Sequence, residues 1–305
     1  MTSIAYLACG TLVTHPSKPE WGPGKVLAVD DCTATVYFRD YPEHKPGDAL
    51  RRIRIDLVKL DLAKSQSDPW LDNIPPLKDG SLGLRRTRLT FEQSVTYFRR
   101  KFPLGFRDQA YIGDGKHTGE RAYKWRAHAL FAQHLGHDVR NELLRKGEIE
   151  ELSSRAKTVL HAVNILHVQE KITMRKGLDH HERAHRFFVE LFNLLDNELV
   201  PNRFVSYFDA ANSLALGERR PTWPIATVLP YLADPLRFVY MKPEVTRDMA
   251  DRLAFDLHYD SRPNWPTYER LITMSGMLLD RLRELGAEDW MDVQSFIYVV
   301  GDQVQ

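Results

Sequence analysis

The sequence WGPGKVLAV, residues 21–29, decides the fold of the N-terminal region. Its glycines and proline favour a tight turn that opens into a strand at 25–29. Residues 33–39 and 52–60 follow with alternating apolar and polar side chains, the pattern of half-buried strands. The side chains expected to share the inward face are Ala34, Val36, Phe38, Ile53, Ile55 and Leu57. Because such strands bury their apolar faces by curling on one another, the sequence predicts a small β-barrel over residues 1–62.

The segment 63–83 differs in composition from both of its neighbours. It is polar, rich in proline, glycine and serine, and has no sustained period. We therefore expect a linker at 63–83, with a second domain beginning at residue 84.

From residue 90 onward the apolar residues recur at helical spacing. Thr90 and Gln93 match a capping box, which predicts the start of the first helix. The expected helices cover about 90–102, 119–135, 180–195, 266–285 and 288–299. The second of these is expected to end at Gly136 in a left-handed conformation, and Arg237–Met241 is expected to be a strand. The predicted fold class is thus α+β, with a mostly helical domain over 84–305 and a candidate sub-boundary near 197–222.

Composition limits the class of protein. The chain has 305 residues, of which 43% are hydrophobic, enough to build packed cores. It contains no apolar run of membrane-spanning length and no basic-then-apolar leader at Met1, so we expect no membrane or secretion role. Cys9 and Cys32 are too few for a disulfide framework or a cysteine-based zinc site. Cytoplasmic residence is the resulting expectation.

Positive charge is concentrated in one stretch. The net charge of the whole chain is only +1, yet residues 81–130 hold eleven basic and four acidic residues, interleaved with aromatic residues. Cations attract phosphates and exposed rings stack on bases, so this composition is typical of a nucleic-acid surface. Alternatively, the rings form core and the cations flank it in solvent. The candidate nucleic-acid-binding residues are Arg85, Arg86, Arg88, Arg99, Arg100, Lys101, Arg107, Lys124 and Arg126.

A candidate metal-binding motif lies at 181–185. His181, Glu182 and His185 fit H-E-x-x-H on an expected helix, where two imidazoles could hold zinc and the glutamate could activate water. Arg183 occupies a position that is usually uncharged in such helices. The zinc motif needs a third ligand, and the same helix already has a coherent packing stripe. A zinc-dependent hydrolase is therefore the alternative hypothesis, and a chance match is the simpler one.

Other standard sites are missing from the sequence. It contains no Gly-rich phosphate loop ending in Gly-Lys-Ser/Thr, no G-x-G-x-x-G after a strand and no G-x-S-x-G elbow. Asp289 and Asp292 lie near an expected helix start, where they favour the helix dipole, and general acid or base work is the less expected use. We expect no catalytic residue and no cofactor.

Three motifs in the first domain carry a family resemblance. Val13-Thr14-His15-Pro16, the turn at 21–26 and the strand residues Val36-Tyr37-Phe38 are together similar to the Tudor-like, SH3-type barrel at the C-terminus of bacterial superfamily-one repair helicases. They resemble more distantly the polymerase-interacting barrel of CarD and of transcription-repair coupling factor. The resemblance implies a docking surface for RNA polymerase or nucleic acid. The chain departs from the family in its long 41–50 loop and in lacking a helicase motor. The remainder resembles uncharacterised bacterial proteins.

These observations favour a non-enzymatic docking or adaptor protein linked to nucleic-acid transactions. Aromatic residues and arginine dominate contacts of this kind. The expected partner-binding residues, which we place on the outward face of the barrel, are Trp21, Tyr37, Arg39, Arg52 and Arg54. A purely structural subunit of a larger assembly is a third hypothesis.

Overall fold

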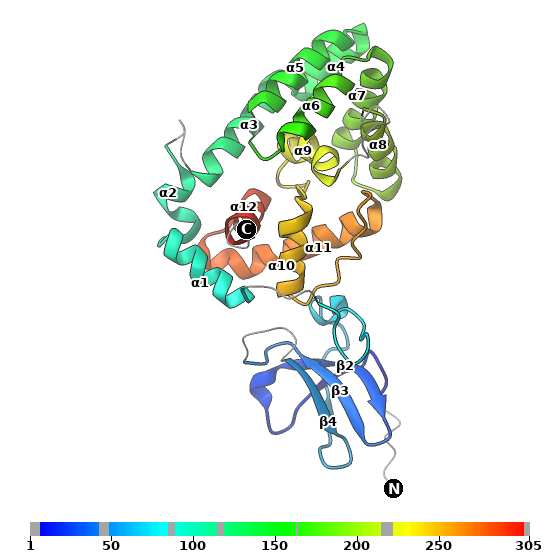
Figure 1. Cartoon of the computed structure of the whole chain (residues 1–305), viewed down its shortest axis with the longest axis vertical. Coiled ribbons are helices and arrows are strands. Elements are labelled where there is room, and N and C mark those ends of the chain that lie inside the picture. Colours follow the sequence, from blue (N-terminus) through cyan, green and yellow to red (C-terminus); the bar gives the residue numbers. More distant parts are fainter. Residues whose placement is uncertain are drawn as a thin grey trace. The chain divides into compact units, whose positions relative to one another are not determined.

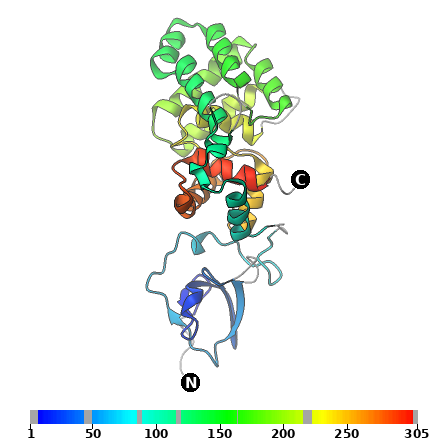
Figure 2. The same cartoon turned by 90° about the vertical axis from the view of Figure 1, so that its left-hand side faces the viewer.

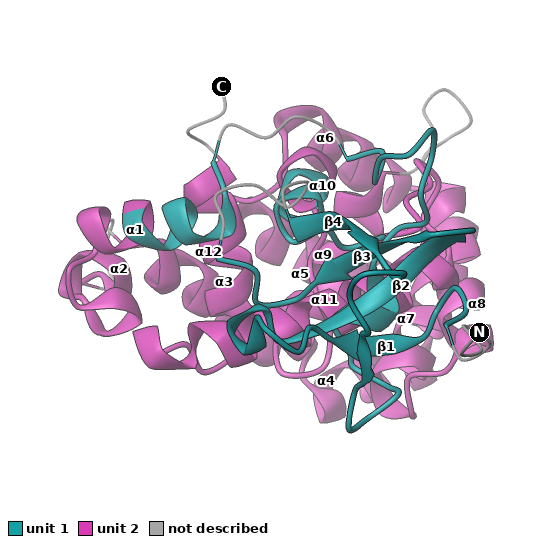
Figure 3. Ribbon diagram, turned by 90° about the horizontal axis from the view of Figure 1, so that it is seen from below, with its two compact units in different colours: residues 1–96, 247–256, 304 teal, residues 97–246, 257–303, 305 magenta. Residues whose placement is uncertain are grey.

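The computed structural model describes residues 7–42, 49–84, 89–114, 119–162, 164–214 and 222–301. The chain divides into two compact units (Figure 3). The first, which we call the sheet unit, comprises residues 1–96, 247–256 and 304; the second, the helical unit, comprises residues 97–246, 257–303 and 305. The fold class is α+β: an N-terminal antiparallel sheet precedes a series of helices, as the sequence predicts.

The sheet has five antiparallel strands in the order β4-β3-β2-β1-β5, of which β2, β3 and β4 run side by side in Figure 1. The strands are β1 (Leu12–Thr14), β2 (Pro23–Asp30), β3 (Thr33–Phe38), β4 (Leu50–Arg54) and β5 (Asp61–Leu62). Within the described residues the outer strands β4 and β5 do not pair, so the sheet is open there. Figure 2 shows the same strands from the side. Residues 43–48 of the expected 41–50 loop lie outside the described residues.

The inward face of the sheet agrees with the alternation in the sequence. Ala34, Val36 and Phe38 have no exposed surface, and Ile53 is 7% exposed. Leu57 is the exception, because β4 ends at Arg54 and a turn follows, which leaves Leu57 71% exposed. The prediction that this side chain faces inward is wrong, since the strand is shorter than the alternating pattern.

The segment 63–83 packs against the other face of the sheet. Leu71, Ile74 and Leu82 are buried in a second apolar cluster together with Leu12 and Tyr37. Lys25 on β2 reinforces this contact, because its Nζ donates to the backbone oxygen of Leu71 at 3.0 Å. Both faces of the central strands are therefore covered where this segment lies.

Helices dominate the described residues after residue 90 (Figure 1). They are α1 (Phe91–Lys101), α2 (Gln109–Ile112), α3 (Glu120–Leu135), α4 (His137–Lys146), α5 (Ile149–Ala162), α6 (Val168–Gly177), α7 (His181–Asp196), α8 (Pro201–Leu214), α9 (Trp223–Ala233), α10 (Pro243–Arg252), α11 (Trp265–Leu282) and α12 (Trp290–Gly301). The predicted capping box of α1 is confirmed: Gln93 N donates to Thr90 Oγ1 at 3.1 Å, and Thr90 N donates to Gln93 Oε1 at 3.0 Å.

Two local predictions about the helical unit are wrong. Gly136 has φ −58° and not a left-handed φ, because α4 begins at the next residue and Gly136 serves as its N-cap. Arg237–Met241 is not a strand. Side chains satisfy its backbone in place of a neighbouring strand: Val239 N donates to Tyr268 Oη, and Met241 N donates to Thr227 Oγ1, each at 3.1 Å.

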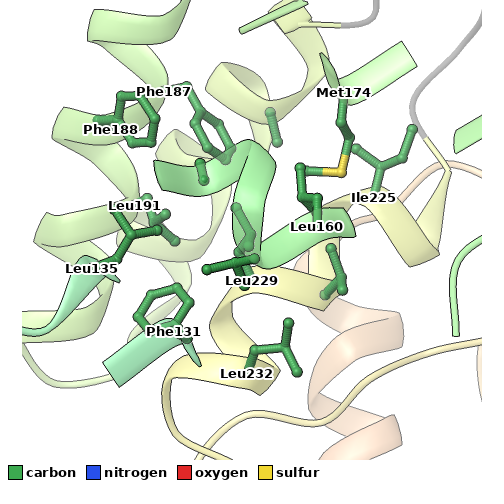
Figure 4. Packing of buried hydrophobic residues seen from close by; sticks show 14 of the residues in the cluster. Phe131, Leu135, Leu160, Met174, Phe187, Phe188, Leu191, Ile225, Leu229 and Leu232 are labelled. Atoms are coloured by element: carbon green, nitrogen blue, oxygen red, sulfur yellow. The ribbon is translucent and has the colours of Figure 1, made fainter. Parts of the chain in front are cut away.

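The main core lies among α3, α5, α6, α7 and α9 (Figure 4). The stripe on α7 supplies Phe187, Phe188 and Leu191, which have no exposed surface, and α3 contributes Phe131 and Leu135. These side chains point toward one another in Figure 4. The α7 stripe is therefore used for packing. Of the helices in the described residues, none combines the length and the apolar character that crossing a membrane requires.

Candidate functional site

The outer face of the sheet carries two of the expected partner-binding arginines. Arg52 and Arg54 alternate with Ile53 on β4, so both point away from the core. Their side chains are 74% and 62% exposed. Arg54 forms an ion pair with Asp56, and Arg52 lies 3.8 Å from Asp30. These contacts are at the surface, where a partner can replace them at small cost.

Two further expected residues, Trp21 and Arg39, are partly covered. The Trp21 ring lies 5.1 Å from Phe38 and 4.8 Å from Tyr41, measured between ring centroids. Arg39 Nη1 donates to Asp68 at 2.6 Å. Its hydrogen bonds to Asp40, and then those to Asp68, raise the pKa of the guanidinium. Trp21 thus packs against the inner core of the sheet unit, so the expectation that it lies on the outward face is corrected. Arg39 is held by two carboxylates.

Tyr37 does not face outward. It is 5% exposed and packs with Leu71, Ile74 and Leu82 of the segment that covers this part of the sheet. The sequence placed it correctly on the face opposite the inner core, but that face is itself buried at this point. The expectation of an exposed Tyr37 is therefore corrected.

The basic stretch separates into exposed and buried residues. Arg85, Arg86 and Arg88 lie outside the described residues. The exposed candidates are Arg99, Arg100, Lys101, Arg107 and Arg126. Lys124 is 1% exposed, so the expectation that it lies on a surface is corrected.

Most rings of the same stretch are core. Phe98, Phe102, Phe106 and Tyr111 pack together, with ring centroids 4.7–6.0 Å apart for the pairs that include Phe98. Trp125 differs from them because it is 50% exposed. Core packing, and not a nucleic-acid surface, therefore accounts for these four rings. Trp125 is the ring that remains at the surface.

A buried cluster of charges lies between α3 and α12. Arg121 donates to Asp289 Oδ2 at 2.6 Å and to Asp292 Oδ1 at 2.5 Å. Tyr111 Oη also donates to Asp292 Oδ1 at 2.5 Å. The side chains of Asp289 and Asp292 are only 7% and 2% exposed. Burial raises the pKa of Asp292. Burial and the negative charge of Asp292 together raise the pKa of Tyr111 well above its usual value.

Lys124 belongs to the same cluster. Its Nζ donates to Ser295 Oγ at 2.6 Å and to Glu120 Oε2 at 3.2 Å. Burial lowers the pKa of the ammonium to about 8, although Glu120 acts in the opposite direction. A lysine beside a serine hydroxyl is the arrangement of a base and a nucleophile. Both side chains are buried, however, so neither presents a surface to a substrate in this structure.

A cavity of about 520 Å³ adjoins this cluster. Its walls include Gly113, Arg121, Trp125 and Arg126. The guanidinium carbon of Arg121 lies 5.8 Å from the centre of the Trp125 ring, within the range of a cation–π contact. The buried carboxylates fix Arg121, and Arg121 in turn supports the exposed tryptophan. This is the part of the basic stretch where a cation and an accessible ring meet.

Residues 7–43 match the model of a family described as a protein of unknown function, DUF3553. The match covers β1, β2 and β3, which form the central part of the sheet. No curated protein and no solved structure matches the chain.

The H-E-x-x-H motif opens α7 on an exposed face. His181, Glu182 and His185 are all exposed, and His181 Nδ1 lies 2.7 Å from Glu150 Oε1 on α5. Among the described residues there is no group of three or more His, Cys, Asp or Glu side chains placed to hold a metal ion. The structure thus gives the two histidines no third ligand within that part of the chain.

Sequence reasoning missed the carboxylates that bind Arg121. It assigned Asp289 and Asp292 to the dipole of a helix start, whereas their main partner is more than 160 residues away in the sequence. The available signal was their position in DWMDVQSFIYV, where apolar residues surround both acids. Two carboxylates in an apolar run need a cation, because an unpaired buried charge is very costly.

Proposed function

We propose that this protein is a non-enzymatic docking protein linked to nucleic-acid transactions, and that its sheet unit is an SH3- or Tudor-like module that binds a macromolecular partner. The observation that carries the proposal is the pair of exposed arginines on one face of β4, Arg52 and Arg54. The resemblance of residues 10–60 to polymerase-interacting barrels makes RNA polymerase or nucleic acid the partner to test first.

The chemistry of this surface supports a role in docking. Guanidinium groups bind carboxylates and phosphates through paired hydrogen bonds, so two of them at alternate strand positions recognise an acidic surface. The register places Thr33 opposite Arg54, so the half-buried Thr33 adds a hydroxyl to the same face of the sheet, whereas Thr35 opposite Arg52 is buried. The neighbouring segment 63–83 covers the Tyr37 end of this face and leaves the arginine end exposed.

The proposal is tested with the full-length chain and a double charge reversal. Tagged wild-type protein and the variant carrying Arg52→Glu and Arg54→Glu are used to capture partners from the source cells, with and without nuclease. We expect the wild type to retain a partner that the variant loses, and loss on nuclease treatment identifies that partner as nucleic acid. The matched control is Arg145→Glu, because Arg145 is 71% exposed and pairs with nearby Glu142 as Arg54 pairs with Asp56. The same partners on all three proteins would refute the proposal.

A direct nucleic-acid contact by the helical unit is the second candidate function. The observation that favours it is the exposed Trp125 beside Arg126 at the 520 Å³ cavity. Bases stack on such a ring while the guanidinium meets a phosphate. We expect single-stranded DNA to bind at low salt, to weaken steeply as salt rises, and to bind at least ten-fold more weakly to Trp125→Ala. A filter-binding titration with no affinity at low salt would remove this function.

A further inference from the structure

A second cavity, of about 460 Å³, lies in the helical unit between α8 and the start of α11. Aromatic and proline side chains dominate its walls: Phe204 and Phe208 on one side, and Pro263, Trp265 and Pro266 on the other. Neither the sheet unit nor the basic stretch contributes to it. The residue types and the size are those of a binding pocket for an apolar ligand with a few polar contacts.

The aromatic floor is fixed before any ligand arrives. Phe204 is 2% exposed and stacks on Tyr268 with ring centroids 4.3 Å apart, while Trp265 meets it edge-on at 5.6 Å. Trp265 occupies the first turn of α11, which is held by its N-cap: Asn264 Oδ1 accepts from Thr267 N at 2.9 Å. A preformed flat surface loses little conformational entropy when a ligand binds.

Four polar side chains around this floor have no polar partner of their own in the described residues. Within the described residues, the side chains of Asp209, Asn212 and Arg262 make no hydrogen bond or ion pair, and neither does the indole N–H of Trp265. Three of these four side chains offer hydrogen-bond donors: the amide of Asn212, the guanidinium of Arg262 and the indole of Trp265. Asp209 is the acidic group among them. The site therefore offers many donors, flat rings, one negative charge at Asp209 and one positive charge at Arg262.

This combination selects one type of backbone. A helix has satisfied its own backbone groups, and a β-strand presents alternating donors and acceptors. A polyproline II segment instead has unpaired carbonyl oxygens, lacks N–H groups at its prolines, and presents flat pyrrolidine rings. Its carbonyls need donors from the groove, and its rings need aromatic surfaces.

We propose that the groove between α8 and residues 262–266 is a docking site for a proline-rich, extended peptide segment that carries a basic residue. The prolines lie on the half-buried Trp265 and against the edge of Phe208, which is 7% exposed. Asn212 together with the Trp265 indole donates to the peptide carbonyls. Asp209 pairs with the basic side chain. The position of Asp209 one helical turn from Val205 and Asn212 puts these residues on the same exposed face of α8.

The test uses the full-length protein and the synthetic peptide Ac-PPLPPR-NH2. We expect saturable binding by calorimetry, with at least a ten-fold loss of affinity when the prolines are replaced by alanine. Asn212→Ala is expected to weaken binding by a similar factor. Because Asn212 is an exposed surface residue, its variant keeps the fold, which unchanged thermal unfolding verifies.

A charge exchange makes the test specific for Asp209. Asp209→Lys should lose affinity for the arginine peptide and bind Ac-PPLPPE-NH2 better than the wild type does. Asp280→Lys is the matched control, since Asp280 is an exposed helical aspartate, 72% accessible, that does not line the cavity. No binding of the arginine peptide at millimolar concentration, or equal binding by all variants, would overturn the proposal.

Discussion

Arg121 in the helical unit and Arg54 in the sheet unit both pair with aspartate, but they occupy opposite environments. The Arg121 side chain is 21% exposed and bridges two nearly buried carboxylates, Asp289 and Asp292. Arg54 is 62% exposed, and its partner Asp56 is two residues away in the sequence. A buried ion pair cannot lose one partner without leaving an unpaired charge in the interior, whereas an exposed pair can exchange its partner for another. Burial thus separates an arginine that stabilises the fold from one that is free to bind.

The hydrogen bonds around Arg121 strengthen this contrast. Asp292 Oδ2 accepts from Glu288 N at 2.8 Å, and Asp289 Oδ1 accepts from Asp292 N at 3.0 Å. Burial alone lowers the pKa of Arg121, but its hydrogen bonds and its attraction to the two aspartates outweigh burial and leave that pKa raised. All four carboxylate oxygens of Asp289 and Asp292 therefore accept hydrogen bonds within the helical unit. Arg54 has no such set of partners beyond Asp56 among the described residues.

Removing the buried cation should have the largest effect. Arg121→Met leaves Asp289 and Asp292 without their cation, and we expect the free energy of unfolding to fall by about 3–5 kcal/mol in urea denaturation. The control is Arg145→Met, which removes an exposed arginine that pairs with Glu142, and it should leave the urea midpoint unchanged. Equal midpoints for the two variants would contradict the contrast between buried and exposed pairs.

Lys124 extends the comparison to pH. Its pKa is about 8 in the folded protein and 10.5 when unperturbed, so the unfolded chain binds more protons between these two values. The free energy of unfolding must therefore rise with pH in this range. We expect the difference in stability between the wild type and Lys124→Met to shift by about 1.5 kcal/mol in favour of the wild type between pH 8 and pH 9.5. Urea denaturation at each pH measures it, and a difference that is flat or falls with pH would mean that Lys124 is not desolvated as the fold implies.

The distance along the sequence between residues in contact explains how far the sequence could predict the structure. Thr90 and Gln93 are three residues apart, so a local pattern was enough to predict their reciprocal hydrogen bonds. The alternation that buries Ala34 and Val36 is likewise local. Tyr37 was misjudged because a segment more than thirty residues away covers it. No local pattern contains such long-range packing.

The candidate sites depended on packing even more strongly. Lys124 lies in a stretch whose basic and aromatic composition is typical of a nucleic-acid surface. Its position on α3, however, places it beside Ser295, 171 residues away in the sequence. Arg52 and Arg54 could be placed correctly because a strand with one buried face exposes every second side chain. The sequence thus indicated which residues have the chemistry that a binding surface uses, and tertiary structure decided which of them are accessible.

Reversing the exposed arginines of the sheet unit should have a small effect on folding. For the variant with Arg52→Glu and Arg54→Glu, we expect a thermal midpoint equal to that of the wild type, because neither side chain packs in a core. Differential scanning fluorimetry on both proteins gives the comparison. A clear fall in the midpoint would show that these arginines support the sheet, and a loss of partner binding could then no longer be assigned to the surface itself.

His185→Ala should have the smallest effect. His185 is exposed at the start of α7, and within the described residues no third ligand completes a site with it and His181. We therefore expect the same metal content by elemental analysis, and the same thermal midpoint, for the wild type and the variant. His161→Ala is a matched control, since His161 is an exposed histidine on α5 outside the motif. One zinc per wild-type chain that His185→Ala loses and His161→Ala keeps would favour the hydrolase hypothesis, because a chance H-E-x-x-H match on a packing helix has no reason to hold metal.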